Sequence, residues 1–171
     1  GGPDVSSSLD RLGELRLLAF DIDGVFTDGR FYLSDDGVES KAFHTQDGFG
    51  IRRALDAGVT VAVISGRRSG AVEKRMAELG VPHVILGCPD KVAAMDELAA
   101  SLAIDVADCG YVGDDVPDLA LLGHVGFSFA VANAVPEVQA RCDYVTRKPG
   151  GFGAVREVCD LVVATRRNTN Q

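Results

Sequence analysis

The stretch Arg16-Leu17-Leu18-Ala19-Phe20-Asp21-Ile22-Asp23-Gly24 joins a short apolar run to an acidic end. Similar apolar runs recur downstream and alternate with longer segments of helical periodicity. This alternation is typical of βαβ units, in which helices connect parallel strands. The sequence therefore predicts an α/β fold, with a Rossmann-like parallel sheet flanked by helices.

The expected elements follow from this periodicity and from the positions of glycines and cap residues. Gly58 and Gly80 follow two helical patterns, where a left-handed C-terminal cap favours glycine, and Ser69 and Asp90 are expected N-caps. The expected strands are 16–20, 59–64, 83–86, 109–112, 126–130 and 144–146, and the expected helices are 47–57, 69–79, 90–102, 116–122, 134–140 and 152–165.

Residues 30–43 break the alternation directly after the first strand. Asp36-Gly37 lies between two strand-like arms, which is a strong signal for a β-hairpin. The apolar face of the hairpin (Phe31, Leu33 and Phe43) needs a partner. We therefore expect a hairpin insertion that either folds back over a site or pairs with other subunits.

The composition limits the classes of protein. The chain has 171 residues, which favours one domain. We expect residues 1–8 to be a disordered tail left from expression and residues 9–171 to form the domain. The net charge of −8 argues against binding to nucleic acid or anionic lipid. No apolar run approaches the ~20 residues needed to span a membrane, so we expect no membrane partner.

The cysteines give no sign of a zinc site or a disulfide framework, because they form no CxxC pair in a chain of ordinary size. We expect free thiols in a reducing cytoplasm. They are Cys88, Cys109, Cys142 and Cys159.

Polar side chains follow several expected strands at the point where each strand ends. The segments are Asp21-Ile22-Asp23-Gly24, Ser65-Gly66-Arg67 and Gly113-Asp114-Asp115, together with Lys91 after the third strand. Ligands of open parallel sheets bind at this edge. Converging carboxylates repel unless a cation joins them, and Mg²⁺ prefers oxygen ligands. We expect Asp21, Asp114 and the backbone carbonyl of Asp23 to bind Mg²⁺.

Each of these pieces also has an ordinary structural interpretation. The acidic segment that begins at Asp21 could be a turn or a helix start, and Ser65 could be an N-cap. Asp114-Asp115 could be a capping turn before Pro117, and Lys91 could be a solvated lysine. Their joint arrival at one edge of the sheet favours a site.

The motifs resemble those of the haloacid dehalogenase superfamily in type, order and expected placement. They are Asp21–Gly29, Ser65–Arg67, Lys91 and Gly113–Asp118. The resemblance implies that Asp21 attacks phosphorus and that Asp23 acts as acid and base. Ser65 and Lys91 would neutralise the phosphoryl oxygens, and Asp114 would hold Mg²⁺. Asp115 and Asp118 would orient the lysine and the waters of the metal.

A closer resemblance, from about residue 9 onward, is to 3-deoxy-D-manno-octulosonate 8-phosphate phosphatases. It rests on the hairpin and on the segments 44–52 and 148–157. It implies a sugar-acid phosphate as substrate, a role in lipopolysaccharide precursor synthesis and no cap domain. It also implies a homotetramer through the 30–43 hairpin and a glycine-rich tail that closes on a neighbour's site. The implied substrate contacts are Asp23, His44, Thr45, Gln46, Asp47, Gly48, Arg52, Ser65, Gly66, Arg67, Arg75 and Lys91.

Three other functions stay open from the sequence alone. A phospho-receiver module shares phosphoaspartate chemistry, but its acidic pair follows the first strand and its acceptor follows a later one. Here Asp21-Ile22-Asp23, the late Gly113-Asp114-Asp115 and the hairpin insertion argue against this order. A non-catalytic oligomerisation module would not need all four motifs. The same reaction on a nine-carbon, sialic-acid-type 9-phosphate is the hardest to separate, because only a few contact residues decide it.

Overall fold

The structure, a computed structural model, describes residues 10–169, and side chains as far as residue 166. The expected tail at 1–8 lies outside the described residues. Within them, no helix is both long and apolar enough to cross a membrane.

A six-stranded sheet forms the centre of the fold, in the order β5-β4-β1-β6-β7-β8, and every neighbouring pair is parallel. β1 occupies a central position, and all its residues are buried because both faces of the sheet are covered there. The predicted parallel sheet is confirmed. The strands are β1 (Leu17–Phe20), β4 (Thr60–Ile64), β5 (His83–Ile85), β6 (Cys109–Gly113), β7 (Phe127–Ala130) and β8 (Tyr144–Val145).

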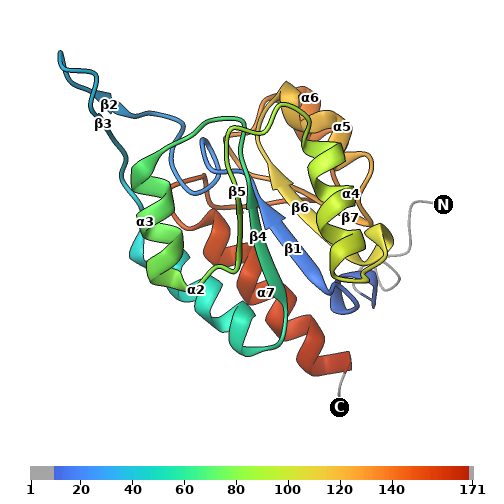
Figure 1. The fold of residues 1–171 in the computed structure, drawn as a ribbon. Coiled ribbons are helices and arrows are strands. Elements are labelled where there is room, and N and C mark those ends of the chain that lie inside the picture. The colour runs from blue at the N-terminus through green and yellow to red at the C-terminus, as the bar shows by residue number, and fades with distance from the viewer. Residues whose placement is uncertain (1–9, 170–171) are drawn as a thin grey trace.

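Helices cover the two faces of this sheet (Figure 1). α2 (Thr45–Asp56) packs along α7 (Ala154–Thr169) on one side, beside α3 (Gly70–Leu79). α4 (Lys91–Ser101) and α5 (Leu119–Leu122) lie on the other side. Three shorter helices connect strands: η1 (Val106–Asp108), η2 (Val116–Asp118) and α6 (Pro136–Gln139).

The ends of the helices follow the cap residues. Ser69 and Asp90 accept hydrogen bonds from backbone N–H groups in the first turns of α3 and α4, as predicted. Gly80 ends α3 in the left-handed conformation, with φ of 75°. The helix expected over 116–122 is divided into η2 and α5, with Pro117 in the first turn of η2.

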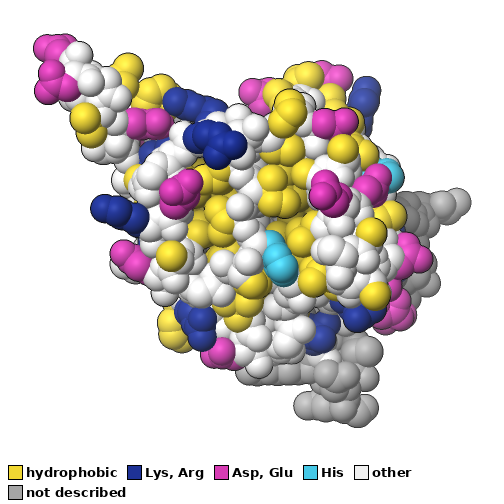
Figure 2. Space-filling view, viewed as in Figure 1, with side chains coloured by type: hydrophobic (Ala, Val, Ile, Leu, Met, Phe, Trp, Pro, Cys, Tyr) yellow, Lys and Arg dark blue, Asp and Glu magenta, His cyan; other side chains and the backbone are white. Residues whose placement is uncertain are grey.

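The hairpin contains only two short strands, β2 (Tyr32–Leu33) and β3 (Glu39–Ser40), which pair antiparallel. Its tip projects from the body of the molecule, as the ribbon and the space-filling view both show (Figures 1 and 2). Tyr32, Leu33 and Val38 are 76%, 65% and 63% exposed. The arms therefore display apolar surface that the rest of the described chain does not cover.

Candidate active site

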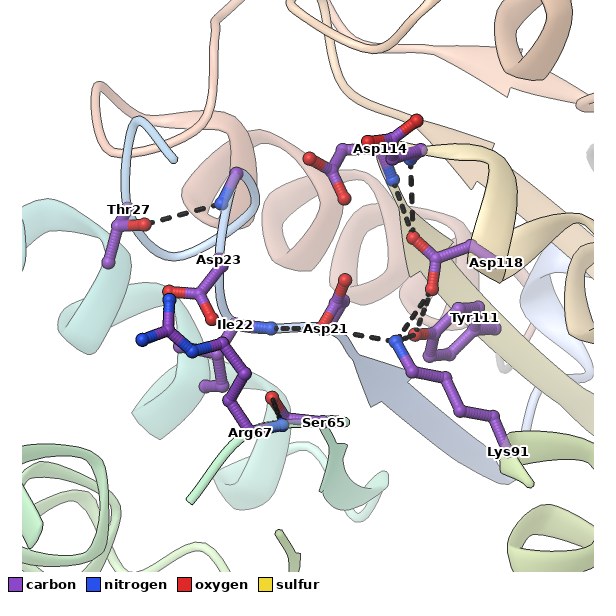
Figure 3. Close-up of polar contacts among 12 residues, drawn as sticks. Asp21, Ile22, Asp23, Thr27, Ser65, Arg67, Lys91, Tyr111, Asp114 and Asp118 are labelled. Carbon is purple, nitrogen blue, oxygen red and sulfur yellow. Dashed lines mark hydrogen bonds and ion pairs between the residues drawn. The ribbon is translucent and has the colours of Figure 1, made fainter. Parts of the chain in front are cut away.

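Three acidic side chains gather where β1 and β6 end (Figure 3). Asp21 directly follows β1, and Asp114 directly follows β6. Asp118 ends η2, one short turn further on. One carboxylate oxygen from each of the three lies within 4.8 Å of the others. The structure thus brings Asp21 and Asp114 together, as the sequence predicts.

Burial makes it unfavourable for all three carboxyl groups to ionise together, even with the Lys91 ammonium beside Asp21. Desolvation, reinforced by the charge of Asp118, raises the pKa of Asp21 to about 7. Desolvation, reinforced by the charges of Asp21 and Asp118, raises the pKa of Asp114 to about 8. A divalent cation would relieve both penalties, and carboxylate oxygens are the donors that hard cations prefer.

Lys91, the first residue of α4, is held by two of these carboxylates and by a tyrosine. Its Nζ lies 2.8 Å from Oδ1 of Asp118, 3.1 Å from the Tyr111 hydroxyl and 3.3 Å from Oδ1 of Asp21. The Tyr111 hydroxyl donates to the same Oδ1 of Asp118, at 2.8 Å. Burial alone would lower the pKa of Lys91, but the charges of Asp21 and Asp118 raise it. Lys91 is therefore a fixed cation beside Asp21.

Both carboxylate oxygens of Asp118 accept hydrogen bonds from other groups of the protein. Its Oδ2 accepts from the backbone N–H of Asp114, at 3.0 Å, and from that of Asp115. Burial opposes ionisation of Asp118, but Lys91 and these donors hold its pKa below the usual value. The exposed Asp115 caps η2 through the N–H of Val116 at 2.7 Å, which matches the capping interpretation of this residue. Asp21 and Asp114 are thus the better candidates for a metal.

The loop after β1 is fixed by side chains whose roles the motif did not reveal. The buried Thr27 hydroxyl accepts from the N–H groups of Gly24, at 3.2 Å, and Gly29, at 3.1 Å. Asn133 donates to the Gly24 carbonyl at 3.1 Å. In the described chain, the Asp23 carbonyl accepts no hydrogen bond, so it is free to act as a ligand.

Ser65 and Arg67 lie on the other side of Asp21 from Asp114 (Figure 3). The buried Ser65 hydroxyl accepts from the backbone N–H of Arg67 at 3.3 Å. Among the described residues, it donates to no acceptor, so its proton is available to a phosphoryl oxygen.

Asp23, the second acid of the motif, faces the hairpin. Its Oδ1 forms an ion pair with Nζ of Lys41, at 2.5 Å. Lys41 follows β3, at the root of the hairpin, and also pairs with Glu39 at 3.0 Å. Sequence reasoning missed Lys41, because nothing local indicates that the returning arm reaches the first motif.

The predicted substrate contacts at the start of α2 differ in exposure and in their hydrogen-bond partners. His44 is the N-cap of α2, with Nδ1 accepting from the N–H of Gln46 at 3.0 Å, while Thr45 and Gln46 are exposed. Asp47 points away from solvent, and its Oδ1 accepts from the N–H of Arg156 in the first turn of α7 at 3.0 Å. Burial raises the pKa of Asp47. Asp47 therefore joins α2 to α7.

Among the described residues, the two helical arginines do not pair with the acidic cluster of Asp21, Asp114 and Asp118. Nη1 of Arg52 donates to the carbonyl of Leu79 at the end of α3, at 2.9 Å. Arg75 pairs with Glu78 at 3.1 Å and packs on Gly48. Contacts of Arg52 and Arg75 with a substrate stay a prediction.

The glycine-rich segment 148–157 contacts the loop after β1 of the same chain. The N–H of Gly150 donates to Oδ1 of Asn133 at 2.7 Å, and a Cβ on Gly150 would lie 1.9 Å from the Gly24 carbonyl oxygen. Gly151 has φ of 79° and donates to the Val25 carbonyl. These glycines allow a close approach to the loop after β1. Residues 148–153 precede α7 and residues 154–157 form its first turn, and closure of this segment on a neighbour's site stays a prediction.

Known proteins are similar to this chain in both sequence and fold. A profile of haloacid dehalogenase-like hydrolases matches residues 89–157. The 3-deoxy-D-manno-octulosonate 8-phosphate phosphatase of Escherichia coli K12 is 46% identical over 162 residues, covering 95% of this chain and 86% of that protein.

Two solved structures extend the comparison. The Moraxella catarrhalis phosphatase of the same name, in complex with magnesium ion, phosphate ion and KDO, is 38% identical with a TM-score of 0.93, covering 98% of this chain and 96% of that one. The cobalt-bound phosphatase of Haemophilus influenzae is 36% identical with a TM-score of 0.89, covering 92% of each chain. The chain therefore belongs to the 3-deoxy-D-manno-octulosonate 8-phosphate phosphatase family of haloacid dehalogenase-like hydrolases.

Proposed function

We propose that this protein is a Mg²⁺-dependent phosphatase that hydrolyses 3-deoxy-D-manno-octulosonate 8-phosphate, a step in lipopolysaccharide precursor synthesis. The observation that carries the proposal is the placement of Asp21. Its carboxylate lies beside Asp114 on one side and 3.3 Å from the Lys91 ammonium on the other. A carboxylate held between a metal site and a cation is suited to attack phosphorus, whose oxygens both positive groups attract.

The reaction we propose proceeds in two steps on Asp21. A carboxylate oxygen of Asp21 bonds to phosphorus while the bond to the sugar oxygen breaks, and Asp23 donates a proton to that oxygen. Asp23 then takes a proton from water, which attacks the phosphoryl group and frees Asp21. Ser65 and Lys91 donate hydrogen bonds to the equatorial oxygens in both steps.

The donor set fits Mg²⁺. Asp21 and Asp114 offer carboxylate oxygens that burial makes hard to ionise without a cation, and the Asp23 carbonyl offers a neutral oxygen. When bound, the ion would neutralise charge on the transferring phosphoryl group. Asp118 would not bind directly, since Lys91, Tyr111 and two backbone N–H groups already use its oxygens.

Phosphate release from a panel of eight- and nine-carbon keto-acid phosphates tests the substrate. We expect hydrolysis with Mg²⁺, none with EDTA, and the highest kcat/KM for the eight-carbon 8-phosphate. Asp21→Asn should abolish turnover while the melting temperature is kept. Preference for a nine-carbon 9-phosphate would contradict the assigned substrate but not the proposed reaction. Residual turnover in Asp21→Asn would contradict the role of Asp21 as the nucleophile.

We further propose that the enzyme works in the cytoplasm as a homotetramer joined through the 30–43 hairpins. The exposed Tyr32, Leu33 and Val38 support this assembly, because apolar arms that project from the body need a partner. Four free thiols suit a reducing compartment. Analytical ultracentrifugation of Tyr32→Ser/Leu33→Ser should give smaller species than the wild type. Val145→Ser, which also removes an exposed apolar side chain, should not, and an unchanged mass for the double variant would reject the hairpin interface.

A further inference from the structure

Lys41 is a buried cation at the root of the hairpin. Its side chain is 1% exposed, although lysine is rarely buried unless it is paired. Two carboxylates pair with it: Oδ1 of Asp23 at 2.5 Å and Oε1 of Glu39 at 3.0 Å. The burial of this ammonium is therefore tied to the second acid of the first motif.

These contacts belong to a row of alternating charges that joins two motif loops. Glu39 pairs with Lys41 on one side and with Nη2 of Arg67 on the other, at 3.5 Å. Phe31, on the outgoing arm, lies under both cations: its ring centroid is 4.3 Å from Cζ of Arg67 and 5.6 Å from Nζ of Lys41. The hairpin root thus connects the loop after β1 to the loop after β4.

We infer that Lys41 is a positioning residue, which holds the Asp23 carboxylate in the orientation needed for proton transfer to the leaving oxygen. The inference rests on the proposed function, in which Asp23 protonates that oxygen. Lys41 occupies Oδ1, and among the described residues nothing else bonds to the Asp23 carboxylate. Oδ2 is therefore the oxygen left to exchange the proton, and its direction is set by the pair.

Proton transfer depends strongly on such placement, because donor and acceptor must lie within hydrogen-bond reach. Without Lys41, the Asp23 side chain could turn about its χ angles, since no second contact restrains it. The loss of kcat/KM on removal of the Lys41 ammonium should depend on the leaving group. A sugar alkoxide needs the proton as the bond to phosphorus breaks, whereas p-nitrophenolate leaves without one.

The test compares kcat/KM for two substrates, because kcat/KM reports only the steps up to departure of the leaving group. For Lys41→Met we expect a loss of about 10²-fold with 3-deoxy-D-manno-octulosonate 8-phosphate. With p-nitrophenyl phosphate we expect a change within about twofold. Lys41→Arg, which keeps the cation, should recover most of the loss. Glu39→Gln, which leaves the pair with Asp23 in place, should change both substrates little.

Other outcomes overturn the inference. An equal loss with both substrates would mean that Lys41 only supports the fold, and no loss with either would mean that it does not position Asp23. The melting temperature and the sedimentation of each variant show whether the hairpin is still in place. If the wild type does not hydrolyse the sugar phosphate, the proposed function fails. The same contrast between any alkyl phosphate that it does hydrolyse and p-nitrophenyl phosphate then still tests Lys41.

Discussion

Gly24 and Asp114 are in direct contact across the site. A Cβ built on Gly24 would lie 1.9 Å from Oδ2 of Asp114 and 2.6 Å from its Cγ. Gly24 also has φ of 85°, which L side chains rarely adopt. The loop after β1 and the loop after β6 therefore fit together only because one of them has no side chain at this point.

Gly24→Ala should displace Asp114 and so weaken Mg²⁺ binding and activity together. The backbone strain alone costs about 1–2 kcal/mol, so a control is needed. Gly37→Ala supplies it, since Gly37 has a similar φ of 80° at the hairpin tip but nothing within 4 Å of the built Cβ. Mg²⁺ titration calorimetry should show weaker binding only in Gly24→Ala, and equal affinity in both variants would contradict the contact.

Tyr111→Phe should lower activity because the Tyr111 hydroxyl joins Lys91 to Asp118 inside the site. Leaving these charged partners short of a hydrogen bond should cost about 1–3 kcal/mol of stability. We expect kcat to fall about tenfold as Lys91 loses its fixed position.

Tyr144→Phe is the matched control for Tyr111→Phe. It also removes a hydroxyl bonded to a carboxylate, Oε2 of Glu157 at 2.7 Å, but outside the site. It should lower the melting temperature without changing kcat. Steady-state kinetics and thermal unfolding of the two variants test this difference. Equal kcat values in the two variants would show that the Tyr111 hydroxyl does not contribute to catalysis.

The effect of Mg²⁺ on stability should grow with pH. Burial raises the pKa of Asp21 to about 7 and that of Asp114 to about 8 in the metal-free protein, from an ordinary value of 3.8. Groups whose folded pKa is raised lose their stabilising contribution as pH rises from about 4 through 8, because the unfolded chain releases those protons first. Mg²⁺ binds the ionised carboxylates and reverses this loss.

Thermal unfolding with Mg²⁺ and with EDTA between pH 6 and pH 9 measures this linkage. The gain in melting temperature from Mg²⁺ should increase across the range, and Asp114→Asn should flatten it. The raised pKa of Lys91 and the lowered pKa of Asp118 act outside this window. A gain that is the same at pH 6 and pH 9 would contradict a metal site built from Asp21 and Asp114.

The residues at the strand ends could be predicted because the edge of a parallel sheet collects whatever follows its strands. Asp21, Ser65 and Asp114 needed only a correct strand assignment. Tyr111 could not be found in this way, since it lies inside β6 and matches an ordinary buried strand residue. Lys41 and Asn133 reach the first motif through long-range packing, which no local pattern encodes.

For the helical arginines, the sequence predicts the helix but not the partner of the guanidinium group within the chain. Helical periodicity predicts which face of a helix is buried and which is exposed. It does not predict where the charged end of a long side chain binds. Arg52 lies on a predicted helix near the motifs, yet its guanidinium caps the carbonyl end of α3. The composition of the segment 148–157 likewise does not reveal that Gly150 packs against the Gly24 carbonyl, where a Cβ would not fit.

Arg52→Met should therefore affect stability more than catalysis. It removes the hydrogen bond to the Leu79 carbonyl and the exposed pair with Asp56, at a cost of about 0.5–1.5 kcal/mol. KM for the sugar phosphate should stay unchanged while the melting temperature falls. A large rise in KM, with the fold intact, would show instead that Arg52 contacts substrate in the assembled protein.

The central claim is that Asp21 accepts the phosphoryl group, and trapping it there is the most direct test. In Asp23→Asn, p-nitrophenyl phosphate can still phosphorylate the chain, but the base for the second step is gone. Mass spectrometry after acid quench with Mg²⁺ should then find close to one phosphoryl group per chain, on Asp21. Phosphate on another residue, or steady release of p-nitrophenol from a chain that is never phosphorylated, would contradict the account.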